Sequence, residues 1–395
     1  MASRIELKKI SNIDIDNKSV LIRVDYNVPI IDGKIINTFR IDSSIDTIQY
    51  CLDRNCKVIL MSHLGRPKEN DSNYSLTPVY NYLNNVFKNS VYFTPDCISE
   101  DAINKSKNLN PKEIHLLENL RFYNEELTCD AAFSEKLSRH ADIFINDAFG
   151  TAHRAHSSNV GVASFFREKG HGLLISKEIK YLKEGIEKES QKLTLLLGGA
   201  KISDKIKLIS RFENIADYIL IGGAMSNNFI SAKGFQVGKS LIEKDCIALA
   251  KKILEKNKDK ILIPSDFVCV ADIDDERNSR IASFEDIGGN EITVDIGPET
   301  ISTFKRIIDN TDCVLWNGPM GIIEKKKFSL GTEKMINIIK KITENNSISI
   351  IGGGDTSSVI SMNDFNKFTH ISTGGGASLK FLSGEIMPAL EALKE

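Results

Sequence analysis

The chain has 395 residues, of which 41% are hydrophobic, so it can bury large cores and is long enough for two domains. Lysine and arginine (51) nearly balance aspartate and glutamate (53), and the net charge of −2 gives no reason to expect a nucleic-acid surface. No segment has the uninterrupted apolar length of a membrane span, and the first ten residues contain no apolar signal core, so we expect a cytoplasmic protein.

The first half of the chain alternates apolar runs with polar or helical stretches. The apolar runs are typical of strands and cover residues 20–28, 57–62, 114–117 and 142–145. Longer polar or helical stretches, such as 42–52 and 130–139, separate them. This alternation predicts βαβ units and a mainly parallel sheet.

Charged or amide side chains follow each of these strands. The arginines among them are Arg23, Arg66, Arg121 and Arg154, and Arg40 follows a short connection. Ligands bind beyond the carboxyl ends of strands in an open parallel sheet, so we expect these groups to converge on one crevice. A single arginine is more often ion-paired or at the surface, but five at matching places predict a site for a small phosphorylated acid, because guanidinium groups pair bidentately with carboxylate and phosphate. His63 is either a structural histidine or a further donor to the same anion.

A stretch with near-helical apolar spacing separates the two halves. It runs from Gly172 to about Ile186, with apolar residues at 173–175, 179, 182 and 186. We expect one helix here, residues 173–186, as the boundary between an N-terminal domain (1–172) and a C-terminal domain that begins at residue 187.

In the second half the strands end in glycine. Apolar runs lead into Gly198-Gly199, Gly222-Gly223, Gly318 and Gly352-Gly353-Gly354. Glycines allow a backbone to lie close to a planar base, a ribose and a polyphosphate, which predicts a nucleotide site. The last run, 348–360, continues into Asp355, Thr356 and Ser357, which suit a helix N-terminus where phosphate binds. Taken alone, that stretch is equally well interpreted as a tight turn between a strand and a helix.

Lys201 and Lys205 come directly after the first glycine pair. Their spacing of four predicts that both lie on the first turns of one helix and face the same side. A solvated helix face is the usual role of such a pair. Their position after Gly198-Gly199 favours contact with phosphate oxygens instead.

Eight motifs, in order, resemble those of the phosphoglycerate kinase family over essentially the full length. They are Arg-Val-Asp-Tyr-Asn-Val-Pro (23–29), Ser-His-Leu-Gly-Arg-Pro (62–67), Glu-Asn-Leu-Arg-Phe (118–122), Asn-Asp-Ala-Phe-Gly-Thr-Ala-His-Arg (146–154), Gly-Gly-Ala-Lys-Ile-Ser-Asp-Lys (198–205), Trp-Asn-Gly-Pro-Met-Gly (316–321), Ile-Gly-Gly-Gly-Asp-Thr (351–356) and Ser-Thr-Gly-Gly-Gly-Ala-Ser (372–378). The resemblance implies an α/β fold of two doubly wound, parallel-sheet (Rossmann-like) domains joined by the interdomain helix. It also implies that residues 379–395 return to the N-terminal domain, so that the nucleotide domain is 187–378.

The resemblance implies a glycolytic and gluconeogenic enzyme. Its reaction would be reversible phosphoryl transfer between 1,3-bisphosphoglycerate with ADP and 3-phosphoglycerate with ATP, with Mg²⁺ as cofactor and with hinge-bending domain closure. The family is usually monomeric, and we expect neither a nucleic-acid nor a membrane partner.

Carried over to matching positions, the resemblance also assigns site residues. The acid would contact Asp25, Asn27, Arg40, His63, Arg66, Arg121 and Arg154. The nucleotide would contact Gly199, Lys201, Lys205, Gly223, Asn317, Pro319, Glu324, Gly352, Gly353, Gly354, Asp355 and Thr356, with Glu324 at the ribose and Asp355 as the magnesium ligand. The catalytic set would be Arg40, Lys201, Gly353 and Gly354. Ala224 and Ile323 replace a common glycine and phenylalanine beside the base pocket, which leaves the nucleotide preference open.

Two other classes of function use a similar fold. A dehydrogenase is disfavoured because residues 352–357 lack the last glycine of Gly-x-Gly-x-x-Gly and no acidic residue follows at 368–371. A P-loop is also excluded, since residues 234–240 have three positions between the glycines where that motif has four. A binding protein without catalytic activity is disfavoured because no matched site residue is missing.

Overall fold

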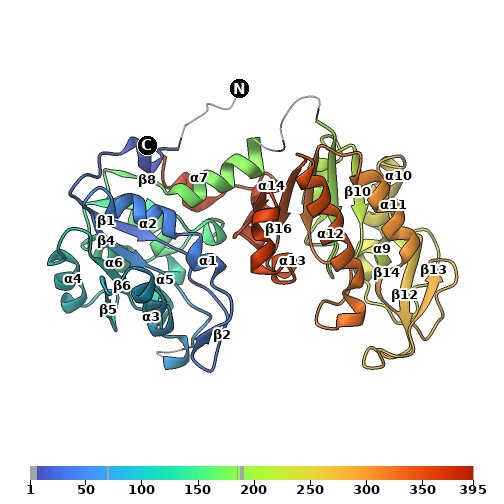
Figure 1. Ribbon diagram of the computed structural model, residues 1–395, viewed down its shortest axis with the longest axis horizontal. Coiled ribbons are helices and arrows are strands. Elements are labelled where there is room, and N and C mark those ends of the chain that lie inside the picture. Colours follow the sequence, from blue (N-terminus) through green and yellow to red (C-terminus); the bar gives the residue numbers. More distant parts are fainter. Residues whose placement is uncertain (1–6, 69–70, 185, 187–190, 395) are drawn as a thin grey trace. The chain divides into compact units, whose positions relative to one another are not determined.

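The computed structural model describes residues 7–68, 71–184, 186 and 191–394, which form two compact units. Unit 1 contains the residues up to Lys180 together with those from Glu385 onward, and unit 2 runs from Tyr181 to Gly384. In each unit, helices pack around a central sheet (Figure 1). Among the residues described, no helix combines the length and the apolar character needed to cross a membrane.

Unit 1 is built on a six-stranded sheet in the order β5-β6-β4-β1-β7-β8, and all neighbouring strands are parallel. The strands are β1 (Ser19–Arg23), β4 (Lys57–Met61), β5 (Val91–Thr94), β6 (Ile114–Leu117), β7 (Ile143–Asn146) and β8 (Lys169–His171), and β2 (Ile30–Ile31) pairs with β3 (Lys34–Ile35) in a separate hairpin. The four strands predicted in this half are confirmed, but β1 ends at Arg23 and not at residue 28. The chain leaves the sheet there because Tyr26 N donates to Ser62 Oγ (2.8 Å) and not to a strand.

Both faces of this sheet are buried. Val20 and Ile22 of β1 belong to one core together with Ile48, and Leu21 belongs to a second core together with Leu137. Successive side chains of a strand point to opposite faces, so this division means that helices cover the sheet on both sides. The helices of unit 1 are α1 (Phe39–Asp42), α2 (Ile45–Leu52), α3 (Thr77–Val86), α4 (Glu100–Lys107), α5 (Glu125–Thr128), α6 (Ala131–Ser138), α7 (Leu173–Ile179) and α15 (Pro388–Glu391).

Unit 2 repeats this plan and adds a second sheet. Its six-stranded parallel sheet has the order β11-β10-β9-β15-β16-β17, which confirms the predicted α/β fold, and a three-stranded antiparallel sheet, β13-β12-β14, was not predicted. The strands are β9 (Leu193–Leu197), β10 (Tyr218–Ile221), β11 (Ile261–Leu262), β12 (Asp266–Val270), β13 (Arg280–Ser283), β14 (Ile292–Ile296), β15 (Cys313–Asn317), β16 (Ile348–Gly352) and β17 (His370–Ile371). The helices are α8 (Ile206–Phe212), α9 (Ser226–Ala232), α10 (Ile247–Lys256), α11 (Pro298–Ile308), α12 (Leu330–Glu344), α13 (Gly354–Ser358) and α14 (Gly376–Leu382).

The stretch between the units contains two helical forms in succession. α7 starts after Gly172 and is followed by a π-helical turn, Lys180–Glu184, so the expected single helix is corrected, and residue 185 lies outside the described residues. The boundary between the units falls inside the π turn, at Lys180 and Tyr181. The Tyr181 ring stacks on His370, with ring centroids 4.9 Å apart. The π turn therefore begins in unit 1 and continues into unit 2, where Tyr181 packs.

The C-terminal residues complete unit 1. In α15, Ala389 N donates to the Ala152 carbonyl (3.0 Å), and Leu393 is buried in the core that contains Leu137. α14 belongs to unit 2, where Arg211 of α8 donates to the Phe381 carbonyl (3.4 Å). The chain thus returns to unit 1 from Glu385, whereas the resemblance implies a return from residue 379.

Asp147 follows β7 and lies buried beneath the start of α7. Its Oδ1 accepts a hydrogen bond from Ile175 N (3.0 Å), and a Cβ atom at Gly172 would lie 2.3 Å from its Cγ, so only glycine fits at that position. Burial raises the pKa of Asp147 to about 7, although hydrogen bonds from Thr47 and from backbone N–H groups of α7 oppose the shift. The attachment of α7 to the sheet is therefore sensitive to pH.

Replacing Asp147 by asparagine should change how the free energy of unfolding depends on pH. The pKa of Asp147 is about 7 in the folded protein and 3.8 without perturbation, so between these values the folded state holds a proton that the unfolded chain releases. The parent should lose about 1.4 kcal/mol of stability per pH unit as the pH rises through this window, relative to Asp147→Asn. Urea unfolding of both proteins from about pH 5 to about pH 8 measures this difference. A difference that stays constant with pH would contradict the prediction.

Candidate functional site

In unit 1, the loops after β1 and β4 hold Arg40 in place. Arg40 Nη1 lies 3.3 Å from Asp25 Oδ2 and donates to the Asn27 carbonyl (3.0 Å). The Asn27 side-chain oxygen accepts a hydrogen bond from Gly65 N (2.9 Å). These contacts link the two loops and orient the Arg40 guanidinium, which is partly exposed.

Three more arginines belong to this end of the sheet. Arg121 donates to the Gly65 carbonyl, and burial, followed by the charges of Arg154 and other arginines, lowers its pKa to about 10. Burial also lowers the pKa of Arg154, and Arg66 and Arg40 lower it further against the opposing charge of Asp25. Arg66 is exposed. Neighbouring arginine charges lower the pKa of both Arg121 and Arg154, and few carboxylates oppose them. This end of the sheet is therefore positively charged and suited to an anion.

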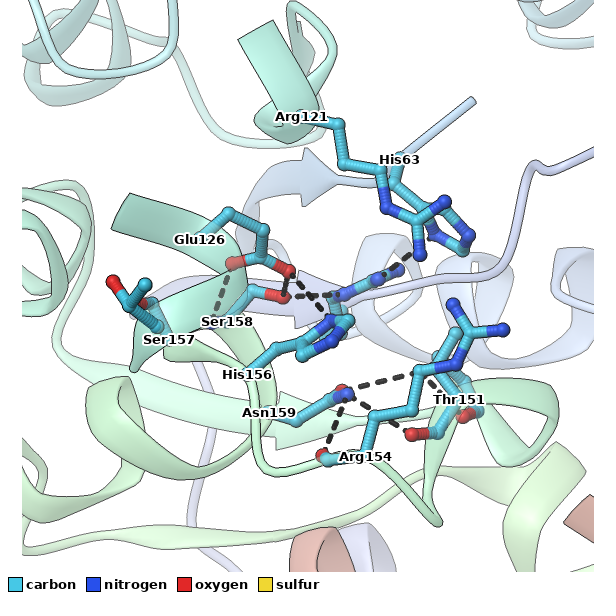
Figure 2. Close-up of polar contacts among 12 residues, drawn as sticks. His63, Arg121, Glu126, Thr151, Arg154, His156, Ser157, Ser158 and Asn159 are labelled. Carbon is cyan, nitrogen blue, oxygen red and sulfur yellow. Dashed lines mark hydrogen bonds and ion pairs between the residues drawn. The ribbon is translucent and has the colours of Figure 1, made fainter. Parts of the chain in front are cut away.

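Two buried donors of this cluster have no hydrogen-bond partner among the described residues. They are His63 Nε2 and Arg121 Nε (Figure 2). Burial and the charges of four arginines hold the pKa of His63 well below 6.5, so its imidazole is neutral. Buried polar atoms without a partner are rare in native proteins, and donors next to a cluster of cations are suited to an anionic ligand.

Arg23 was predicted to be one of five converging arginines, and the structure corrects this. Its side chain is fully buried and donates to Ser158 Oγ (2.8 Å), to the Val24 carbonyl and to His63 Nδ1 (3.1 Å). The reason is topological: β1 is an inner strand between β4 and β7, so the side chain at its end is covered. Arg23 therefore lies under the anion site and supports it.

In unit 2, glycine loops after the strands pack directly against each other. Gly199 N donates to the Pro319 carbonyl (2.8 Å), and Gly223 N donates to the Met320 carbonyl (3.1 Å). Gly199 and Gly223 both have positive φ, at 93° and 62°. The loops after β9, β10 and β15 are thus held together by direct backbone contacts.

A cavity of about 320 Å³ opens beside these loops. Seven residues singled out from the sequence line it, namely Gly199, Gly223, Ala224, Pro319, Ile323, Glu324 and Asp355. Apolar residues that sequence reasoning missed form much of its wall, namely Leu241, Phe267, Ile292 and Val294. Three of these belong to the antiparallel strands β12 and β14, where an apolar side chain has no feature that separates a pocket wall from a core. Such a cavity, apolar with a few polar groups, fits a planar base.

Lys201 and Lys205 do not lie on one helix, and this prediction is wrong. α8 begins only at Ile206, and the preceding residues form turns. The cause is a tertiary contact: Ser203 N and Oγ both donate to the Glu243 carboxylate (3.0 and 2.6 Å), which holds this segment out of the helix. Lys201 is exposed, whereas Lys205 is buried.

Lys205 donates to Asn317 Oδ1 at the end of β15. Burial lowers its pKa to about 8, while the charges of Asp204 and Asp355 raise it. Asn317 Nδ2 has no hydrogen-bond partner in the described part of the chain. It faces the next glycine loop, since Cβ atoms at Gly352 and Gly353 would lie 3.1 and 3.2 Å from it. Lys205, with its lowered pKa, and the Asn317 amide together form a second set of donors suited to an anion.

The segment from β16 into α13 confirms the predicted strand, glycine loop and helix start. Gly353 has a φ of 100°, which favours glycine, and α13 follows directly. Thr356 does not cap this helix but accepts a hydrogen bond from Gly318 N (2.7 Å), so it ties the loop to the end of β15. Asp355 is exposed in the first turn of α13.

Three carboxylates line this cavity, those of Asp295, Glu324 and Asp355. Within the part of the chain that the structure describes, no group of three or more His, Cys, Asp or Glu residues could hold a metal. Mg²⁺ is usually bound through one or two carboxylates together with substrate phosphates. Asp295 is buried and accepts hydrogen bonds from Ile296 N and Gly331 N, whereas Asp355 is exposed and fits a metal that arrives with a nucleotide.

Comparisons with known proteins agree over nearly the whole chain. Residues 10–385 match the family model described as "Phosphoglycerate kinase". Proteins named phosphoglycerate kinase from Finegoldia magna and Dictyoglomus turgidum are 44% and 42% identical to the chain; the first comparison covers 98% of the chain and 99% of the relative, the second 97% of each. The solved structures of phosphoglycerate kinases from Coxiella burnetii and Pyrococcus horikoshii each have a TM-score of 0.84 and 32% identity, cover 98% of the chain, and are themselves covered to 99% and 98%.

Replacing Gly223 by alanine should destabilise unit 2 more than the same change at Gly234. Both glycines have positive φ, which costs an alanine about 1 kcal/mol at either position. Only at Gly223 would the new Cβ atom meet backbone atoms, 2.4 Å from Gly199 N, whereas nothing lies within 4 Å at Gly234. Thermal and urea unfolding of the two variants measures the difference. Equal losses would show that the glycine loops are not closely packed.

Proposed function

The chain belongs to the phosphoglycerate kinase family, and from this premise we propose that unit 1 binds the phosphorylated acid and unit 2 the nucleotide. As a member of this family it is a kinase of glycolysis, which transfers a phosphoryl group between 1,3-bisphosphoglycerate with ADP and 3-phosphoglycerate with ATP. The observation that carries the division between units is the contrast at the strand ends, with arginines in unit 1 and packed glycines in unit 2.

We assign to the acid site the seven residues that the resemblance implies for it. Arg66, Arg121 and Arg154 would pair with carboxylate and phosphate oxygens, His63 would donate to one of them, and Asp25 and Asn27 would orient Arg40 toward the transferred group. The unpartnered donors His63 Nε2 and Arg121 Nε support this proposal, because an anionic substrate supplies the acceptor that each lacks.

The nucleotide site of the proposal has an apolar part and a phosphate part. The base would lie in the cavity lined by Gly199, Gly223 and Pro319, beside Ala224 and Ile323, which stand where a glycine and a phenylalanine are common in the family. Glu324 also lines the cavity and would accept hydrogen bonds from the ribose hydroxyls. Lys205, Asn317, Thr356 and the backbone of Gly352 to Gly354 would bind phosphates. Mg²⁺ bound with the nucleotide would neutralise phosphate charge, and Asp355 would be its protein ligand.

Phosphoryl transfer needs alignment and charge stabilisation more than covalent chemistry. We propose that Arg40 and Lys201 contact the oxygens of the moving group and that the backbone N–H groups of Gly353 and Gly354 stabilise the developing charge. Lys201 is exposed in the structure, so it is free to move toward a bound phosphate. Monomeric state and location in the cytoplasm stay predictions.

Because the two reactants would bind to different units, the reaction also requires the units to come together. We propose a hinge closure about the α7 segment, where the change from α-helix to π turn coincides with the boundary between the units. Closure would exclude water from the transferred group.

A coupled assay with 3-phosphoglycerate, ATP and Mg²⁺ tests the function directly. The parent should turn over, and Lys201→Ala should reduce kcat by about a hundredfold or more, as for other preorganised donors, with the KM for the acid changed only a few-fold. Lys251→Ala, at an exposed position on α10, is the control and should behave like the parent. Absence of activity in the parent contradicts the function, and a parent-like Lys201→Ala contradicts the role of that lysine.

Small-angle X-ray scattering tests the hinge closure. The radius of gyration should fall when 3-phosphoglycerate and MgADP are both present and should fall less with either alone. The reason is that the closed state is stabilised most when both ligands bind to it more tightly than to the open state. An unchanged radius with both ligands at saturating concentration would refute the closure and leave the assignment of the two sites intact.

A further inference from the structure

A buried chain of hydrogen bonds lies under the acid site of unit 1. It connects Glu126 of α5 to Ser158 (Figure 2). At its other end it connects Ser158 to Arg23 and Arg23 to His63. The exposed fraction is 0% for Glu126, Ser158 and Arg23 and 2% for His63. The catalytic proposal above uses only the last member, so the other three require an explanation.

Hydrogen-bonding capacity sets the direction of every contact. A guanidinium has five N–H donors and no acceptor, so Arg23 Nη2 donates to His63 Nδ1 (3.1 Å). His63 Nδ1 must then be the unprotonated nitrogen, and the ring proton is on Nε2. Since Nε2 is the buried nitrogen without a partner, the chain leaves one N–H donor at the acid site.

On its other side Arg23 donates to Ser158, which in turn donates to Glu126. Its Oγ accepts from Arg23 Nε (2.8 Å), so its single hydroxyl hydrogen is free to donate to Glu126 Oε1 (2.7 Å). The second carboxylate oxygen accepts from Ser158 N (2.9 Å), and His156 Nδ1 lies 3.6 Å from Oε1. Arg23 thus donates at both ends, to His63 and to Ser158, and the hydrogen bonds from Arg23 through Ser158 to Glu126 run in one direction, so that they strengthen one another.

Glu126 also provides charge compensation for Arg23. Burial lowers the pKa of Arg23, and the negative charge of Glu126 is the largest opposing effect, ahead of Asp25. A buried cation without such a partner is costly, and the neighbouring arginines would add repulsion. Glu126 thus keeps the Arg23 guanidinium charged and oriented under His63.

We infer that Glu126, acting through Ser158 and Arg23, is a positioning residue that fixes His63 in the neutral tautomer with its proton on Nε2, so that His63 donates to an anionic oxygen of the acid substrate. This inference rests on the proposed function for the identity of that substrate. Without the chain, His63 could place its proton on Nδ1 and present a lone pair to an anion, which repels it.

The tautomer can be measured on the free protein without any activity. Side-chain ¹⁵N chemical shifts of His63, assigned with a His63→Gln sample, should show a protonated Nε2 and an unprotonated Nδ1 in the parent. Glu126→Gln should produce a mixture of tautomers. Glu125→Gln is the matched control, because it makes the same change at the adjacent, exposed position of the same helix, and it should leave the spectrum unchanged.

Kinetics provide the second test. Glu126→Gln should raise the KM for 3-phosphoglycerate about tenfold, the typical effect of losing a hydrogen bond to a charged group, with kcat and the KM for ATP nearly unchanged. His63→Gln should retain more acid binding than His63→Asn, because a glutamine amide nitrogen reaches the Nε2 position and an asparagine amide reaches only Nδ1. If Glu126→Gln does not fold, Ser158→Ala interrupts the same chain and should raise the same KM.

Several outcomes would overturn the inference. They are a proton on Nδ1 of His63 in the parent, a Glu126→Gln variant with parent-like spectrum and acid KM, or equal increases in KM for both substrates, which would indicate general disruption. Loss of kinase activity in the parent would refute the proposed function alone, since the tautomer measurement does not depend on turnover.

Discussion

Repulsion between guanidinium groups is the physical constraint on which unit 1 depends. The charge of Arg154 lowers the pKa of Arg121, and the charges of Arg66 and Arg40 lower the pKa of Arg154, so the cluster stores unfavourable electrostatic energy that a bound anion relieves. Two carboxylates act against it: Asp25, which pairs with Arg40, and Glu126 underneath. The number of acidic partners is small enough to keep the site attractive to anions and large enough to hold its cations in place.

In unit 2 the candidate site is formed by backbone atoms of glycine loops and not by a cluster of charged side chains. Gly199, Gly223 and Gly318 adopt conformations that other residues rarely adopt, and their loops touch through N–H and carbonyl groups. A base and a polyphosphate can then approach main-chain atoms without displacing side chains. Charge enters this site only at isolated positions such as Lys205, whose burial leaves it close to losing its proton near neutral pH.

The sequence predicted those features that depend on neighbours along the chain. The run of residues 348–360 is a strand, a glycine loop and a helix, since an apolar run followed by glycines determines this locally. Predictions failed where a distant contact decides. Arg23 is covered because β1 is an inner strand, and the segment before Lys205 is not helical because Glu243 binds it. Glu126 was missed because it is fully buried while Leu127 next to it is 50% exposed, which inverts the usual pattern.

The return of the chain to unit 1 has a consequence for biosynthesis. The last residues of the core of unit 1, among them Leu393, leave the ribosome after all of unit 2. Domains usually fold in the order in which they are made. Here unit 2 can complete its fold first, whereas the earlier-made unit 1 must wait, with part of its apolar surface exposed, for α15 to arrive. The first unit to be synthesised is thus the last to be finished, and it is the part of the nascent protein most in need of protection from aggregation.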